Sequence, residues 1–317
     1  MHARAMVKGP GVVTGRYGTI GEVFFIERDF WPHNTTLFAQ DFHGNDPLFI
    51  SYLLRTIDYR SHSGKSGVPG VNRNDLHEEI VTVPPTLAEQ QAIAEALSDV
   101  DALIDALERL IAKKRAIKQG AMQELLHPEE GWVEKRLGDT AILKARIGWQ
   151  GLTTAEYLDT GDYYLVTGTE FNGGYIDWQN CHYVSAARYA QDRNIQLRKH
   201  DVLVTKDGTI GKVALITHLD KPATLNSGVF VIRPIENAFD PEFFYYILCS
   251  NVFTDFLTQL SAGSTINHLY QKDFVSFVYK TPETLSEQTA IAAILSDMDA
   301  EIAALERRRD KTKLLKQ

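Results

Sequence analysis

Thr86 to Glu108 has the sequence TLAEQQAIAEALSDVDALIDALE, and Thr284 to Glu306 repeats it as TLSEQTAIAAILSDMDAEIAALE, 198 positions later (285 minus 87). In each copy the apolar residues recur at alternating steps of four and three, an average of 3.5 that is typical of a coiled-coil seam. The predicted seam residues are Ile93, Leu97, Val100, Ile104, Leu107 and Ile111 in one copy, and Ile291, Leu295, Met298, Ile302 and Leu305 in the other. The sequence therefore predicts two long helices, each of which needs a partner helix.

Both helix starts carry the same local signals. Each copy opens with Thr-x-x-Glu, at Thr86 and at Thr284. This pattern predicts a capping box, in which the hydroxyl and the carboxylate satisfy unpaired backbone N–H groups of the first turn. A proline, Pro84 or Pro282, closes a strand-like run just before each start, over residues 80–83 and 275–279. We expect the two helices to begin by the same chemistry.

Composition limits the class of protein. The chain has 317 residues, 44% of them hydrophobic, and a net charge of −8. It has no apolar run of about 18 residues and no secretory signal pattern, so we expect a cytoplasmic protein that does not enter a membrane. The two cysteines are far apart and predict neither a disulfide scaffold nor a zinc site. The acidic charge disfavours a free-standing nucleic-acid binder, although DNA-reading subunits can leave phosphate neutralisation to their partners.

The repeat extends beyond the helices. The tetrapeptide Gly-Thr-Ile-Gly occurs at residues 18–21 and 208–211, so a turn-rich, strand-rich region precedes each long helix. Shorter helices are expected over residues 47–57 and 241–260. Only 17 residues precede the first tetrapeptide, whereas about 77 separate the linker from the second, so the first domain is expected to be incomplete. The predicted segments are 1–85 (partial domain), 86–127 (helix), 128–131 (linker), 132–283 (complete domain) and 284–317 (helix).

No pattern in the sequence predicts catalysis. The only Pro-Pro pair is a helix start, so the Asn/Asp-Pro-Pro-aromatic motif of an amino-group DNA methyltransferase is missing. Asp99-x-Asp101 and Asp297-x-Asp299 do not predict a metal site, because helical residues two apart point about 200° away from each other. We interpret these aspartates as solvated or partner-facing charges. No catalytic residue, metal ligand or cofactor is expected.

Polar loops on the repeated strand-rich frame are the candidate binding residues. The second tetrapeptide, flanked by Lys206 and Lys212, offers backbone amides and a hydroxyl near positive charge. A tight turn that simply needs glycines is the competing interpretation. Other side chains have the donors and acceptors that contact base edges. The candidates are Arg146, Trp149, Gln150, Thr169, Glu170, Asn172, Tyr175, Lys206, Gly208, Thr209, Gly211, Lys212, Ser264, Thr265 and Asn267, with Arg16, Gly18, Thr19 and Gly21 in the first copy.

The duplicated Leu-x-Glu-Gln-x-Ala-Ile-Ala-x-x-Leu-Ser-Asp-x-Asp motif, the two Gly-Thr-Ile-Gly turns and the alternation of domain and helix resemble the DNA-specificity subunits of type I restriction-modification systems. The resemblance spans nearly the whole chain. It implies two target-recognition domains that each read half of a split site in double-stranded DNA. It also implies two antiparallel helices that act as a spacer and dock two methyltransferase subunits, joined by motor-nuclease subunits. The family is not itself catalytic.

The predicted fold is therefore α/β (α+β), with β-rich recognition domains joined by two long antiparallel coiled-coil helices. The predicted function is sequence-specific DNA binding that positions a partner methyltransferase. The sequence also allows a homodimer, in which a second copy would supply the missing half of the first domain. The alternative function is a coiled-coil scaffold with two protein-interaction domains and no role on DNA, which the acidic charge favours.

Overall fold

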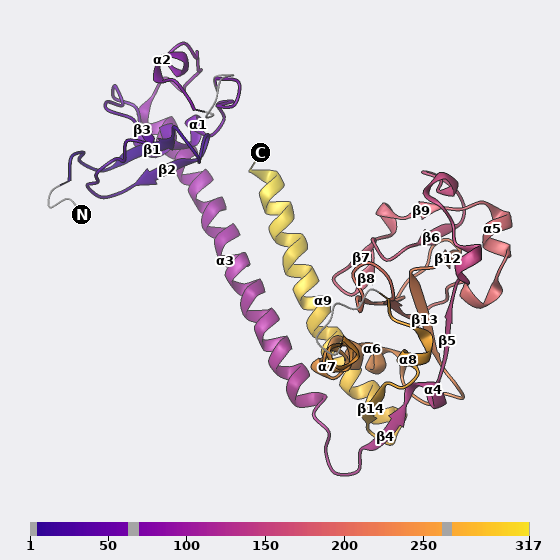
Figure 1. Cartoon of the computed structure of the whole chain (residues 1–317). Coiled ribbons are helices and arrows are strands. Elements are labelled where there is room, and N and C mark those ends of the chain that lie inside the picture. The colour runs from indigo at the N-terminus through magenta and orange to yellow at the C-terminus, as the bar shows by residue number, and fades with distance from the viewer. Residues whose placement is uncertain (1–4, 63–69, 262–267, 317) are drawn as a thin grey trace. The chain divides into compact units, whose positions relative to one another are not determined.

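The computed structural model describes residues 5–62, 70–261 and 268–316 (Figure 1). The chain divides into two compact units, and each unit contains part of both long helices. Unit 1 comprises residues 1–111 and 305–317, and unit 2 comprises residues 112–304. In the described part of the chain, no helix is long and apolar enough to cross a membrane.

The two long helices are α3 (Leu87–Leu125) and α9 (Leu285–Leu315), as the repeated motif predicts. The hydroxyl of Thr86 accepts the Glu89 N–H at 3.3 Å, and the hydroxyl of Thr284 accepts the Glu287 N–H at 3.3 Å. Both starts thus use the threonine half of the predicted capping box, which satisfies a backbone donor that has no partner within the helix.

Ion pairs within each unit show that the helices run antiparallel. In unit 2, Lys114 of α3 pairs with Glu301 of α9 at 2.7 Å, and Lys118, one turn later, pairs with Asp299 at 2.5 Å. In unit 1, Asp101 pairs with Lys316 and Glu108 pairs with Lys313. Rising residue numbers on one helix meet falling numbers on the other. These contacts and the mixture of sheets and helices confirm the predicted fold class.

The β-rich part of unit 1 is a small antiparallel sheet with one covering helix. The sheet has the order β2-β1-β3, and α1 packs against β1 and β2. Its core contains Val12, Val23, Tyr59 and Val71. The elements are β1 (Gly11–Gly15), β2 (Val23–Ile26), β3 (Thr36–Phe38), α1 (Pro47–Leu54) and α2 (Arg73–Leu76).

The β-rich part of unit 2 is larger and contains several sheets. A four-stranded antiparallel sheet has the order β11-β10-β13-β5, and a three-stranded sheet has the order β12-β6-β9. The strands are β4 (Val133–Arg136), β5 (Ala141–Ala145), β6 (Tyr164–Val166), β7 (Phe171–Asn172), β8 (Tyr175–Ile176), β9 (His182–Tyr183), β10 (Val202–Thr205), β11 (Val213–Leu215), β12 (Ala223–Leu225), β13 (Val229–Pro234) and β14 (Val278–Thr281). Two short antiparallel pairs, β14-β4 and β7-β8, also belong to this unit.

Helices close one face of the four-stranded sheet. The main core of unit 2 is aromatic, and Phe230, Phe243, Phe274 and Phe277 are all at most 2% exposed. Leu295 of α9 is fully buried in the same core, so the second long helix is part of this unit's hydrophobic interior. The helices are α4 (Leu137–Thr140), α5 (Ala186–Ala190), α6 (Pro241–Cys249), α7 (Asn251–Ser261) and α8 (Gln271–Phe274), with the 3₁₀ turns η1 (Gly148–Gln150), η2 (Thr154–Glu156), η3 (Trp178–Asn180) and η4 (Arg193–Ile195).

Two local predictions are wrong. Residues 241–260 form two helices, because Ser250 is extended (ψ 174°) and its hydroxyl bonds to both sides of the break, donating to the Ile247 carbonyl and accepting from the Val252 N–H. Residues 80–83 form no strand, and Ile80 is 95% exposed. The matching run 275–279 does contribute to β14, which pairs with β4.

A buried glutamine ties each long helix to the shorter helix of its own domain. Gln90 accepts the N–H of Asp46, the N-cap of α1, at 2.9 Å and donates to the Pro84 carbonyl at 3.0 Å. Gln288 accepts the N–H of Asp240, the N-cap of α6, at 2.8 Å and donates to the Pro282 carbonyl at 2.9 Å. Gln90 is 3% exposed and Gln288 is fully buried. The glutamine of the repeated motif therefore joins helix and domain.

Candidate nucleic-acid interface

The second Gly-Thr-Ile-Gly segment is a tight turn between β10 and β11. Gly208 and Gly211 have φ angles of 67° and 81°, a region that favours glycine. Thr205, at the end of β10, closes the turn, because its hydroxyl donates to the Thr209 carbonyl and accepts the Lys212 N–H at 2.9 Å. Gly208, Thr209 and Lys212 are exposed. The turn thus requires its glycines and also presents a hydroxyl and an ammonium to solvent.

The first copy has the same backbone conformation. Gly18 and Gly21 have φ angles of 76° and 85°, and Gly18 and Thr19 are exposed. The Arg16 guanidinium lies 5.1 Å from the centroid of the Tyr17 ring beside this turn. The repeated tetrapeptide therefore gives each unit an equivalent solvent-facing turn with a basic residue two positions before its first glycine.

In unit 2 a second loop, residues 167–170, lies beside this turn. Its buried carboxylate, Glu170, accepts hydrogen bonds from the N–H groups of Thr167 and Gly168, both at 3.0 Å, and from the Thr169 hydroxyl at 2.9 Å. A Cβ added at Gly168 would lie 2.7 Å from the Thr205 side chain, so the loop backbone packs closely against the end of β10. Glu170 acts as the internal support of the loop, and Thr169 is left exposed at its tip.

The two loops border one hollow of ≈ 670 Å³, which brings Thr169, Gly208, Thr209 and Lys212 of the predicted set together. Asn226 forms part of its wall and connects two segments, donating to the Tyr157 hydroxyl at 2.7 Å and accepting the Leu152 N–H at 3.0 Å. The other lining residues are Thr154, Tyr157, Asp159, Thr167, Gly168, His182, Thr205, Asp207, Ser227 and Gly228. The lining is rich in hydroxyls, which both donate and accept hydrogen bonds.

The charges around the hollow are mixed. Lys212 contributes a cation, and Asp159 and Asp207 contribute carboxylates. Asp207 also pairs with the imidazole of His268. A carboxylate repels phosphate but accepts a hydrogen bond from the exocyclic amino group of cytosine or adenine. The hollow is therefore better suited to base edges than to a run of phosphates.

Arg146 is placed in the core. It is 1% exposed and donates to the Leu225 carbonyl at 2.7 Å, to the Thr224 hydroxyl at 3.2 Å and to the Gln191 side chain at 3.1 Å. Burial lowers the pKa of its guanidinium. Arg146 and the buried Glu170 thus hold segments of this domain together, and direct contact with a ligand is assigned to neither. The sequence missed Thr205 and Asn226, for which residue type alone carries no signal.

The remaining candidates lie elsewhere or are not described. Asn172 and Tyr175 are opposite each other in the β7-β8 hairpin, and burial raises the pKa of Tyr175 to about 12. The Lys206 ammonium lies 5.4 Å from the centroid of the Phe230 ring, and Gln150 is half-buried in η1. The side chain of Trp149 and residues Ser264, Thr265 and Asn267 lie outside the described part of the structure.

The predicted seam residues differ in burial. Ile104, Leu107 and Ile302 are 8%, 4% and 8% exposed, and Leu295 is fully buried. Leu97, Val100, Ile291, Met298 and Leu305 are half-buried. Ile93 is 37% exposed, whereas its neighbour Ala94 is 2% exposed. At this end of α3 the buried side thus lies one residue further along than the seam pattern predicts.

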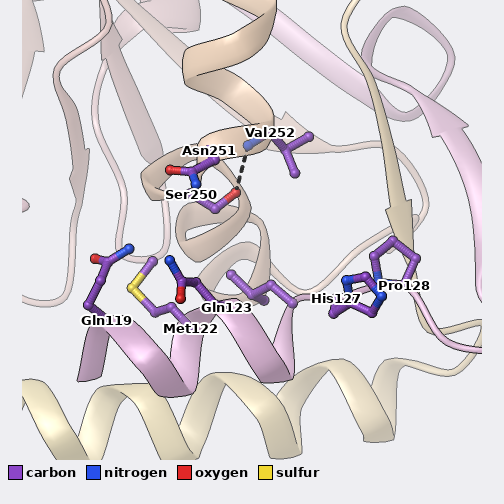
Figure 2. Close-up of a pocket in the computed structure, with 9 residues that line it drawn as sticks. Gln119, Met122, Gln123, His127, Pro128, Ser250, Asn251 and Val252 are labelled. Carbon is purple, nitrogen blue, oxygen red and sulfur yellow. Dashed lines mark hydrogen bonds between the residues drawn. The ribbon is translucent and has the colours of Figure 1, made fainter. Parts of the chain in front are cut away.

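A second hollow, of ≈ 310 Å³, lies in unit 2 at the end of α3 (Figure 2). Gln119, Met122, Gln123 and His127 line it from the end of α3, and Ser250, Asn251 and Val252 face them from the break between α6 and α7. Met122 and Leu126 are also core residues of this unit. This hollow is therefore a consequence of how the helix end packs against the break at Ser250.

The repeated order of β-rich domain and long helix, with an exposed glycine turn in each unit, defines a protein built from two related modules. The chain belongs to the family of type I restriction-modification DNA specificity domains, whose model matches residues 5–119 and 129–315. Members of this family supply the DNA sequence recognition of these systems.

Individual relatives agree with this assignment. The chain is 25% identical over 305 residues to the type I restriction enzyme MjaVIII specificity subunit of Methanocaldococcus jannaschii, covering 88% of this chain and 69% of that protein. It is 24% identical over 275 residues to the putative MjaX specificity subunit of the same organism, covering 80% of this chain and 61% of that protein.

The fold is shared with the crystal structure of a type I restriction-modification S subunit from M. genitalium. That comparison has a TM-score of 0.70 at 16% identity and covers 99% of this chain and 82% of that one. A chain from a structural study of complex assembly and conformational transition in a type I restriction-modification system aligns with a TM-score of 0.58 at 18% identity, covering 100% of this chain and 82% of that one.

Proposed function

We propose that this protein recognises a split DNA target, with residues 1–85 and 132–283 as its two recognition domains. Each domain reads one half of the site through the loops around its Gly-Thr-Ile-Gly turn. The observation that carries this proposal is the pair of equivalent exposed turns, Gly18 to Gly21 and Gly208 to Gly211, of which the second borders a hydroxyl-lined hollow with the exposed Thr169.

In this proposal the protein itself performs no methyl transfer or cleavage. It positions two methyltransferase subunits on the DNA, and motor-nuclease subunits join the same assembly. The net charge of −8 supports a division of labour, because a protein that neutralises few phosphates binds DNA weakly when alone. The partner subunits would supply most of the contacts to phosphate, and this chain would supply the contacts to bases.

Two substitutions in the hollow are expected to change DNA binding in different ways. Lys212→Ala removes a cation that can contact phosphate, so it should weaken binding to all sequences and reduce the slope of log affinity against log salt by about 1. Thr209→Ala should change the preferred base at one or two positions, at a cost of roughly 1 to 3 kcal/mol for the preferred site. The measurement is selection from random duplexes, followed by salt titration, with the chain bound to its methyltransferase partner.

Lys199→Ala is the matched control, because Lys199 is exposed in the same unit but does not line the hollow. It should leave both the selected sequence and the salt slope unchanged. Failure of the assembled wild-type complex to select any sequence would instead support the alternative, a coiled-coil scaffold that binds proteins and not DNA, which the acidic charge favours.

A further inference from the structure

A tyrosine, an aspartate and a lysine from three different elements meet in each unit. In unit 1 the Tyr52 hydroxyl of α1 donates to Asp101 of α3 at 2.9 Å, and the Lys316 ammonium, just beyond the end of α9, donates to the other oxygen of the same carboxylate. The Lys316 nitrogen also lies 5.5 Å from the centroid of the Tyr52 ring. One carboxylate therefore connects the domain helix, its own long helix and the opposite long helix.

The same cluster occurs in unit 2, but there the aspartate belongs to α9 and the lysine to α3. The Tyr246 hydroxyl of α6 donates to Asp299 of α9 at 2.9 Å, and Lys118 of α3 donates to the other oxygen of Asp299 at 2.5 Å. The Lys118 nitrogen lies 5.3 Å from the centroid of the Tyr246 ring. Asp101 and Asp299 are 198 positions apart, as are Lys118 and Lys316, so the two clusters are copies made from the sequence repeat.

These clusters occupy the facing sides of the helices and are largely withdrawn from water. The Lys118 and Asp299 side chains are 19% and 18% exposed, and those of Lys316 and Asp101 are 27% and 33% exposed. The other aspartate of each Asp-x-Asp pair, Asp99 or Asp297, is exposed. The structure thus separates each Asp-x-Asp pair into one solvated and one helix-facing carboxylate.

An apolar seam of regular period tolerates a slip by seven residues, because such a slip again brings apolar side chains face to face. The polar clusters do not tolerate it. A seven-residue slip of α9 along α3 would move Asp299 from Lys118 to the level of either Ile111 or Leu125. Removing one partner from a buried ion pair leaves an uncompensated charge, which is strongly unfavourable. A polar residue in a seam thereby selects one register at some cost in stability.

We propose that the two Tyr-Asp-Lys clusters are register locks, one in each unit, that fix the axial alignment of α3 and α9 and attach each β-rich domain to the aligned pair. If the protein reads a split site, as proposed above, the locks are also positioning residues for the distance between its two halves. This second statement rests on the proposed function, whereas the lock itself does not.

Charge exchange in unit 2 tests the lock. Asp299→Lys alone places two ammonium groups together, so it should lower the melting temperature by roughly 5 °C or more. The exchanged pair, Asp299→Lys with Lys118→Asp, should recover at least half of that loss. Asp297→Lys is the matched control, since it makes the same charge change on the exposed side of α9, and it should melt within about 2 °C of wild type.

Zero-length carbodiimide coupling of Lys114 to Glu301 reports the register directly, because their charged groups lie 2.7 Å apart in the present alignment. Peptide mass spectrometry should detect this link in wild type, in the control and in the exchanged pair, with a several-fold lower yield in Asp299→Lys. If Asp299→Lys melts and couples like Asp297→Lys, the clusters do not set the register.

Site selection with the methyltransferase partner separates the two statements. If Asp299→Lys changes the helix register while the selected DNA keeps its spacing, the clusters do fix the register. The proposal that they also set the distance between the two half-sites would then be wrong.

In unit 1 the lock should weaken in acid. Burial alone would raise the pKa of Asp101, but hydrogen bonds from Lys316 and Tyr52 and the charge of Arg55 outweigh it, and the pKa is lowered. A lowered pKa in the folded state stabilises the protein above the ordinary aspartate value of about 4, and this stabilisation is lost as pH falls through the lowered value. Asp101→Asn should therefore melt below wild type at pH 7, and the difference should shrink below about pH 4. A difference that stays constant down to pH 2 would show that the charge of Asp101 contributes nothing.

Discussion

The double substitution Ile104→Asp with Leu107→Asp is expected to unfold the helix pair of unit 1. These side chains are 8% and 4% exposed and lie between the ion pairs of Asp101 with Lys316 and of Glu108 with Lys313. A carboxylate buried there without a partner costs about 3 to 5 kcal/mol. Because a whole protein is stable by only about 5 to 15 kcal/mol, two such charges remove most of the available stability.

The measurement is thermal unfolding followed by circular dichroism, with coupling of Glu108 to Lys313 as the local readout. Leu103 and Leu110 provide the control. Each is 38% exposed and directly precedes a buried isoleucine of the same helix, Ile104 or Ile111. Leu103→Asp with Leu110→Asp should leave the melting temperature within a few degrees of wild type. Equal melting of the two double variants would mean that the predicted seam does not hold this unit together.

Lengthening both long helices by four residues is expected to widen the gap between the two half-sites by one or two base pairs. Four helical residues add about 6 Å, and duplex DNA rises about 3.4 Å per base pair. The insertions belong after Lys113 in α3 and after Ala304 in α9, near the boundaries of the two units. Each Tyr-Asp-Lys cluster then keeps its three residues in one unit. On each helix the inserted residues fall between the residue of one cluster and the residue of the other.

The readout is sequence selection by the assembled complex with its methyltransferase partner. A four-residue insertion in α3 alone is the control, because the two helices then differ in length between the locks and one lock must break. That variant should lose melting temperature and select poorly. Paired insertions that retain binding and the original gap would show that the two half-sites are read but that the length of the helices does not determine their spacing.

Local signals predicted much of the fold. The helix starts at Thr86 and Thr284 depend on contacts within four residues, and the glycine turns depend on backbone angles that other residues adopt at a cost. Short-range chemistry of this kind is visible in sequence, and duplication makes it visible twice. The break at Ser250 escaped prediction because a serine that ends one helix and starts the next resembles any polar residue on a helix surface.

The candidate site was predictable only in part. Thr169, Gly208, Thr209 and Lys212 do meet around one hollow. Donor and acceptor chemistry alone cannot distinguish a side chain that faces a ligand from one that supports a loop, and Arg146 has the same five donors in either place. Segments distant in sequence determine its burial, since its hydrogen bonds go to β12 and to Gln191.

By itself the sequence determined the duplication, the two long helices with their starting points, the two glycine turns and the resemblance to DNA-specificity subunits. These features follow from periodicity, caps and backbone preferences, which act over a few residues. The tertiary structure alone decided which aspartate of each Asp-x-Asp pair faces the opposite helix, which glutamine joins helix to domain, and which candidate residues reach solvent. Those outcomes depend on packing between segments up to 215 positions apart, as Asp101 and Lys316 are, and no local pattern encodes them.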